Sequence, residues 1–203
     1  MNVVIVHGFV NNALFMRPMA RHLTAAGHTC HVPTLTPFDA RPGLVAMAAQ
    51  LRGHVKGALP DGAPFAIVAF SMGALVARYY LQELGGHERA KAFYSIAGPH
   101  KGARYADFYP GAGTRDMRPK SAFLRDLDRS SSKLQGLPQV CYWTPNDVLI
   151  HPAEAAVLCG AESVQIPSFS HALMLLDKRL FTEMEGRLAL LDQSETDARS
   201  SRE

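Results

Sequence analysis

Short apolar runs rich in β-branched and aromatic residues alternate along the chain with longer segments in which apolar residues recur at helical spacing. This alternation is typical of a parallel sheet flanked by helices, so the sequence predicts an α/β fold with a mainly parallel sheet of about six strands. The expected strands are 3–7, 28–32, 64–70, 90–97, 139–143 and 163–166, and the expected helices are 15–26, 42–59, 72–84, 152–158 and 172–190.

One interval interrupts the alternation. Residues 98–138 are rich in glycine and proline and contain one short helical piece at 121–127. Insertions of this length between packed elements are usually binding loops or lids, so we expect a short cap-like insertion over the active site. We interpret residues 1–192 as a single domain. The polar and charged stretch 193–203 is expected to be a disordered tail.

The strongest local signal is the segment Ala69-Phe70-Ser71-Met72-Gly73, which joins an expected strand directly to an expected helix. Strand, serine, helix is the context of a nucleophile elbow, whose usual pattern is G-x-S-x-G. Ala69 and Gly73 are small enough to leave room for the sharp turn that lifts a serine hydroxyl above the edge of a sheet. A serine before a helix is also a good N-cap, so Ser71 has two interpretations at this point.

A serine nucleophile needs a base that takes its proton and a carboxylate that orients the base. Asp147 and His171 each follow the end of an expected strand, where parallel sheets place their ligands. The order Ser71, Asp147, His171 is the one that α/β-hydrolases use. The sequence therefore predicts a catalytic triad of these three residues.

Each partner of the serine has an alternative. Asp147 lies in a Pro-Asn-Asp segment that is also typical of a turn. His100 and His151 are the rivals of His171 for the role of base. His100 precedes the acid in the chain, and His151 is too close in sequence to Asp147 to come from a separate strand, so His171 is favoured as the base.

Acyl transfer through a serine also needs backbone donors for the oxyanion of the tetrahedral intermediate. The amide that follows the nucleophile is that of Met72, and the second donor usually comes from the loop after the first strand. In that loop we expect Phe9, because Gly8 allows the backbone to approach closely. Gly8 by itself is equally typical of an ordinary turn.

Several short motifs follow one another along the chain: His7-Gly8-Phe9, Ala69-Phe70-Ser71-Met72-Gly73, Ala97-Gly98-Pro99-His100-Lys101-Gly102, Asp116-Met117 followed by Ser121-Ala122-Phe123-Leu124, Asp147, and Ser170-His171. From residue 1 to about 190 this ordered set resembles a small bacterial lipase or esterase of the α/β-hydrolase superfamily. The resemblance implies hydrolysis of carboxylic esters with no cofactor and no metal. It also implies the triad above, with Phe9 and Met72 as oxyanion donors.

An apolar cleft beside the triad would favour an acyl ester or another apolar ester. The expected substrate-binding residues are Val10, Phe15, Phe108, Met117 and Phe123. Core packing is the alternative for each of them. The insertion also carries basic residues that could attract an anionic lipid or a phosphorylated acyl carrier, or else form an ordinary solvated surface: Lys101, Arg104, Arg115, Arg118, Lys120 and Arg125.

Composition narrows the choice of function. Hydrophobic residues make up 47% and charged residues 19%, and the net charge of +3 is not gathered in a dense basic run, so we expect a soluble globular protein that does not bind nucleic acid. Three scattered cysteines and the lack of a signal or spanning segment predict a cytoplasmic location.

The alternatives to an esterase or lipase keep the same fold. A thioesterase or acyltransferase would use the same triad, and a non-catalytic hydrolase-like protein would bind a ligand without cleaving it. A lipase that acts at a membrane surface is a further alternative, although the insertion is short for a large swinging lid. The expected partner in the enzymatic cases is a small-molecule ester or lipid.

Overall fold

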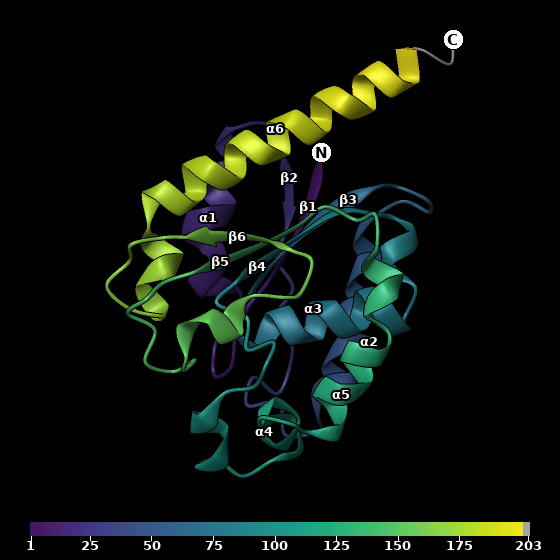
Figure 1. Ribbon diagram of the computed structural model, residues 1–203. Coiled ribbons are helices and arrows are strands. Elements are labelled where there is room, and N and C mark those ends of the chain that lie inside the picture. Colours follow the sequence, from purple (N-terminus) through teal and green to yellow (C-terminus); the bar gives the residue numbers. More distant parts are fainter. Residues whose placement is uncertain (201–203) are drawn as a thin grey trace.

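The computed structural model describes the backbone of residues 1–200 (Figure 1). Its centre is one sheet of six parallel strands in the order β2-β1-β3-β4-β5-β6. The strands are β1 (Asn2–Val6), β2 (Thr29–His31), β3 (Phe65–Phe70), β4 (Ala90–Ile96), β5 (Gln139–Trp143) and β6 (Glu162–Gln165). All six predicted strands are therefore present within one or two residues of their expected bounds.

Helices cover both faces of the sheet (Figure 1). Strand side chains alternate between the two faces, and in β1 Val3 and Ile5 face one core while Val4 and Val6 face the other. The helices α1 (Ala13–Ala25) and α6 (Lys178–Ser200) share the core of Val3 and Ile5, and α2 (Leu44–Ala58) and α3 (Met72–Glu83) share the other. Burial on both faces explains why the strands are nearly continuous apolar runs.

The insertion after β4 packs mainly against helices. It contains α4 (Ala112–Met117), which the sequence did not predict, and α5 (Ala122–Arg129), with short 3₁₀ turns at Arg104–Asp107 and Ser131–Leu134. The ring of Phe123 on α5 stacks on Tyr79 of α3, with centroids 5.5 Å apart. The buried guanidinium of Arg78 binds Asp128 at 2.8 Å. Helix α5 is thereby fixed alongside α3.

The end of the chain differs from our expectation of a helix at 172–190. A 3₁₀ turn at Ala172–Leu176 comes first, and α6 then runs over Lys178–Ser200, with Leu180, Met184 and Leu188 buried at helical spacing. Residues 193–200, expected to belong to a disordered tail, continue this helix, and residues 201–203 lie outside the described residues. Within the described range, neither α6 nor another helix is both long and apolar enough to cross a membrane.

Candidate active site

Four segments meet at the carboxyl edge of the sheet. Ser71 follows β3, Asp147 lies beyond β5, His171 lies beyond β6, and the loop with Phe9 follows β1. Because the strands are parallel, their carboxyl ends are at the same edge. The candidate residues named from the sequence are therefore on one side of the molecule, where open α/β sheets bind ligands.

Ser71 has a strained backbone. Its φ is 52° and its ψ is −124°, a conformation that non-glycine residues rarely adopt. Its amide donates to the carbonyl oxygen of Ile96 at 2.8 Å, which anchors the turn to the neighbouring strand. The side chain makes no capping hydrogen bond to α3. Ser71 is thus the N-cap residue of α3 by position, but its hydroxyl does not cap the helix.

Two glycines allow this turn to pack against the end of β1. A Cβ atom on Gly73 would lie against the carbonyl oxygen of His7, closer than real Cβ atoms come, and 2.9 Å from that of Val6. A Cβ atom on Gly8 would lie 3.1 Å from the Cβ atom of Ser71. The first strand and the serine turn thus approach each other as closely as glycine permits.

Gly73→Ala should destabilise the protein by about 1–3 kcal/mol or more, because the added methyl group collides with strand backbone that cannot move without breaking β1. Urea unfolding followed by circular dichroism measures the change. The matched control is Gly53→Ala on α2, where a Cβ atom meets nothing within 4 Å. That substitution should stabilise the protein by up to about 1 kcal/mol. Equal effects of the two substitutions would contradict this account of the turn.

Asp147 and His171 form a buried pair. Nδ1 of His171 lies 2.6 Å from Oδ2 of Asp147, and both residues are at most 5% exposed. The other carboxylate oxygen, Oδ1, accepts the amides of Leu149 at 3.0 Å and Ile150 at 2.9 Å. The carboxylate is thus held on both sides, and among the described residues no hydrogen bond involves the second ring nitrogen of His171, Nε2.

Side chains also join the two loops that carry this pair. The hydroxyl of Thr144 and the side-chain amide of Asn146 both donate to the carbonyl oxygen of Ser168, at 2.7 and 2.9 Å. The ring of Phe70 lies 4.8 Å from that of His171, between centroids. The residue directly before Ser71 therefore supports the imidazole, which the sequence did not reveal.

The two other histidines have different surroundings. His151 is exposed, and its neighbour in sequence, Asp147, pairs with His171 instead. His100 is buried and its Nε2 lies 2.8 Å from the hydroxyl of Ser95 on β4. In the described part of the chain, no three His, Cys, Asp or Glu side chains gather where they could hold a metal ion.

His100 should make stability depend on pH. Burial, with a smaller effect from the charge of Arg78, lowers the pKa of His100 well below 6.5 in the folded protein. The unfolded chain therefore binds this proton more readily, so the stabilisation is present above about pH 6.5 and is lost as the pH falls. We expect a slope of up to about 1.4 kcal/mol per pH unit from this residue. Urea unfolding between pH 7.5 and 5 should show a smaller slope in His100→Gln, and an unchanged slope would contradict the assignment.

The expected oxyanion donors lie on either side of the serine turn. Met72 is the first residue of α3, so its amide has no acceptor within the helix. In the described part of the chain the amide of Phe9 likewise makes no backbone hydrogen bond. The ring of His7 accepts from the Leu35 amide at 2.9 Å, and its Nδ1 lies 2.9 Å from the Gly8 carbonyl oxygen. Because the Gly8–Phe9 peptide is planar, this contact also orients the Phe9 amide.

Tyr105 is a site residue that the sequence did not single out. Burial raises the pKa of Tyr105 to about 12, although a side-chain hydrogen bond with Ser71 acts in the opposite direction. The phenol therefore keeps its proton at neutral pH. Its ring lies 6.3 Å from that of Phe9, and Tyr109 packs edge-on to Phe9 at 5.7 Å. The start of the insertion thus contacts both the serine and the loop after β1 that carries Phe9.

The expected substrate-binding residues fall into two groups. Val10, Phe15 and Phe108 are exposed at the carboxyl edge of the sheet. Met117 is buried in the core that contains α2 and α3, but its sulfur lies 3.7 Å from the hydroxyl of Tyr105, so its part in the cleft stays a prediction. Phe123 is buried in the same core and stacks on Tyr79, and our expectation that it lines the cleft is corrected. The physical reason is that α4 and α5 turn their apolar faces toward α2 and α3.

Comparison with known protein families gives one match. Residues 2–148 match the family model described as palmitoyl protein thioesterase. Among curated proteins, none matches this chain. The matched range includes the serine turn and Asp147, and it ends before His171.

Solved structures with the same fold are numerous and distant in sequence. The lipase BlEst2 of Bacillus licheniformis has a TM-score of 0.72 at 15% identity, covering 91% of each chain. The methylesterase protein MES16 of Arabidopsis has a TM-score of 0.68 at 16% identity, covering 94% of this chain and 99% of that one. A pyrethroid hydrolase of Sphingobium faniae has a TM-score of 0.59 at 14% identity, covering 99% of each chain. These matches confirm the predicted α/β-hydrolase fold.

Proposed function

Since the chain belongs to the palmitoyl protein thioesterase family of α/β-hydrolases, we propose that it is a serine hydrolase that cleaves carboxylic esters through an acyl-enzyme. Ser71 is the nucleophile, His171 the base and Asp147 the carboxylate that orients the base. The observation that carries the proposal is the buried Asp147–His171 contact of 2.6 Å, at the same sheet edge as a strained serine whose hydroxyl caps no helix.

The proposed reaction has two halves. In the first, the Ser71 oxygen bonds to the acyl carbon while Nε2 of His171 takes the hydroxyl proton. The bond between the acyl carbon and the leaving group then breaks, and the leaving group departs with that proton. In the second, water attacks the acyl-enzyme, the same nitrogen takes its proton, and the acid leaves as the proton returns to Ser71. The amides of Phe9 and Met72 would stabilise the oxyanion in both halves, each at about 3 kcal/mol.

A thioester is the second candidate substrate, and the family model favours it. The motifs of the sequence resemble lipases and esterases, whereas the matching model is named for a thioesterase. Both leaving groups depart from the same tetrahedral intermediate, so the residues and their roles are unchanged. The difference lies in the leaving group, which is an alkoxide or phenolate in one case and a thiolate in the other.

The test begins with covalent labelling. Purified protein is treated with a fluorophosphonate, and the modified residue is located by mass spectrometry of its peptides. We expect a single adduct on Ser71. Hydrolysis of matched phenyl and thiophenyl esters of the same acids, from short to long acyl chains, then ranks the leaving group and the chain length.

The outcomes distinguish a hydrolase or acyltransferase from a non-catalytic binding protein. An adduct on Ser71 with turnover supports the hydrolase, and transfer of the acyl group to an added alcohol would identify an acyltransferase. Folded protein that takes up no fluorophosphonate and turns over no ester would refute the proposal and favour a non-catalytic ligand-binding protein.

A further inference from the structure

Exposed apolar side chains gather around the candidate active site. In the described part of the chain, nearly all exposed large hydrophobic residues lie in the loops that follow the strands or in the first helical turn after those loops. The one exception is Leu190 on α6. Phe108 and Phe169 are each 85% exposed and Val148 is 82% exposed. We call the residues Val10, Phe15, Phe108, Val148, Phe169 and Leu176 the apolar rim.

The rim has contributions from four different connections of the sheet. Val10 and Phe15 follow β1, Phe108 follows β4, Val148 follows β5, and Phe169 and Leu176 follow β6. Single exposed hydrophobic residues scattered over a protein surface are common. Here the exposed hydrophobic residues are concentrated at one edge of the sheet, which a scattered distribution does not explain. Grouped apolar side chains on a soluble surface mark a place where something else binds.

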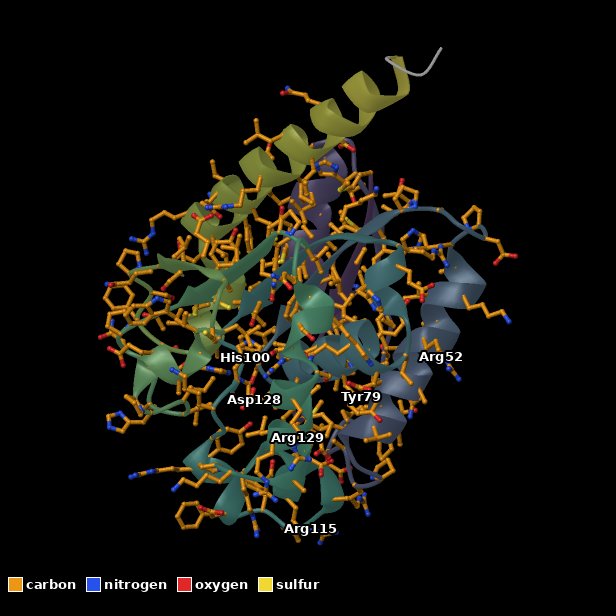
Figure 2. All side chains as sticks on the ribbon, turned by 45° about the vertical axis from the view of Figure 1, so that its right-hand side comes forward. Arg52, Tyr79, His100, Arg115, Asp128 and Arg129 are labelled. Carbon is orange, nitrogen blue, oxygen red and sulfur yellow. The ribbon has the colours of Figure 1, made fainter. Side chains whose placement is uncertain are left out.

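Exposed cations accompany the rim. Arg17 on α1 and four residues of the insertion, Lys101, Arg104, Arg115 and Lys120, are exposed and form no ion pair within the described residues. Figure 2 shows Arg115 at the end of the molecule formed by the insertion. Of the acidic residues on the same side, Asp39 and Asp107 each pair with an arginine at 2.6 and 3.2 Å. Glu154, next to the Ala155 carbonyl that accepts the Lys101 amide, is exposed and has no ion pair within the described residues, so it is one acidic residue against five free cations. The accessible charge beside the rim is therefore mainly positive.

We propose that the apolar rim and its flanking cations dock this protein onto the surface of a lipid bilayer that carries anionic head groups. Aromatic and aliphatic side chains would enter the boundary between head groups and acyl chains, while the lysines and arginines bind phosphates beside them. The rim is exposed in the free protein, so docking requires no opening of a lid. The charge pattern favours this occupant over a second copy, because two rims with the same sign of charge repel each other.

Docking would place the carboxyl edge of the sheet against the bilayer. Asp147 directly precedes Val148 of the rim, and His171 lies two residues after Phe169. Acyl chains could therefore reach the serine turn from the lipid side. The docking proposal concerns binding and does not depend on catalysis. It can therefore be tested with a chain in which Ser71→Ala prevents any hydrolysis of the vesicles.

The experiment measures cosedimentation of the full chain carrying Ser71→Ala with vesicles. One set contains phosphatidylcholine alone and the other also contains phosphatidylglycerol. We expect binding to the anionic vesicles that weakens as salt rises, and much weaker binding to the neutral ones. Adding Phe108→Ser and Phe169→Ser together should weaken binding at least about tenfold, because each removes a phenyl ring from the inserted surface.

The matched control is Leu190→Ser, which removes an exposed apolar side chain on α6 away from the rim and should leave binding unchanged. Circular dichroism establishes that each variant is folded. No vesicle binding, unchanged binding by the double variant, or equal binding to neutral vesicles would overturn the proposal. The proposal would also be overturned if light scattering showed that the protein forms a dimer, the dimer did not bind vesicles, and the double variant were a monomer.

Discussion

Alanine in place of Ser71 should lower kcat by on the order of a million-fold, the largest effect expected of any single change in this protein. The substitution removes one oxygen atom and leaves the backbone strain unchanged, because alanine must adopt the same φ of 52°. Residual catalysis would come from the Phe9 and Met72 amides and from substrate binding. Steady-state hydrolysis of a phenyl ester, with the fluorophosphonate adduct as a second readout, measures the loss.

The control for this result is an exposed serine outside the site. Ser132→Ala, in the 3₁₀ turn after α5, should retain wild-type kcat and the adduct on position 71. Unfolding in urea shows whether the Ser71→Ala protein remains as stable as the wild type. Wild-type turnover by folded Ser71→Ala would exclude this serine as the nucleophile.

The sheet and the serine turn could be predicted because their signals are local. Each strand of a sheet covered on both faces is a short apolar run. At the turn after β3, a strand, a serine and a helix follow in direct succession, with small residues two positions before and after the serine. The helix α4 was missed because its six residues include Gly113 and have no apolar period long enough to recognise. The length of α6 was missed because its last residues are polar.

The walls of the site were less predictable, since packing partners lie far away in sequence. Phe123 looks like a cleft residue in a loop-rich insertion, but its ring stacks on Tyr79, 44 residues earlier, and so belongs to the core. His7 accepts a hydrogen bond from the amide of Leu35, which lies 28 residues later in the connection between β2 and α2. A side chain whose role depends on such a partner gives no local signal.

Tyr105 shows the same limit within the site. Phe108 was expected to bind substrate, whereas it is Tyr105 that interacts with Ser71 and packs against Phe9. The 3₁₀ turn at Arg104–Asp107 decides which aromatic side chain faces inward, and Phe108 is left 85% exposed. The sequence could therefore suggest the residues of the proposed triad more readily than the side chains that pack around them.

Asp147→Asn should lower kcat by about four orders of magnitude while leaving the fold intact. The amides of Leu149 and Ile150 donate to Oδ1, so they would retain the carbonyl oxygen of an asparagine at that position. Its amide nitrogen would then occupy the place of Oδ2 and donate to Nδ1 of His171. The imidazole would have to carry its hydrogen on Nε2, and it could no longer take the proton of Ser71.

The structural cost of Asp147→Asn should be small, which distinguishes it from removal of the side chain. Asp147→Ala leaves two backbone amides and a buried imidazole without their acceptor, and should cost about 1–3 kcal/mol of stability in addition to activity. Asp126→Asn, at an exposed ion pair with Arg129 on α5, is the matched control and should change kcat by less than about twofold. Wild-type kcat in the folded Asp147→Asn protein would mean that His171 does not depend on this carboxylate for its tautomer, and the assignment of Asp147 would then be wrong.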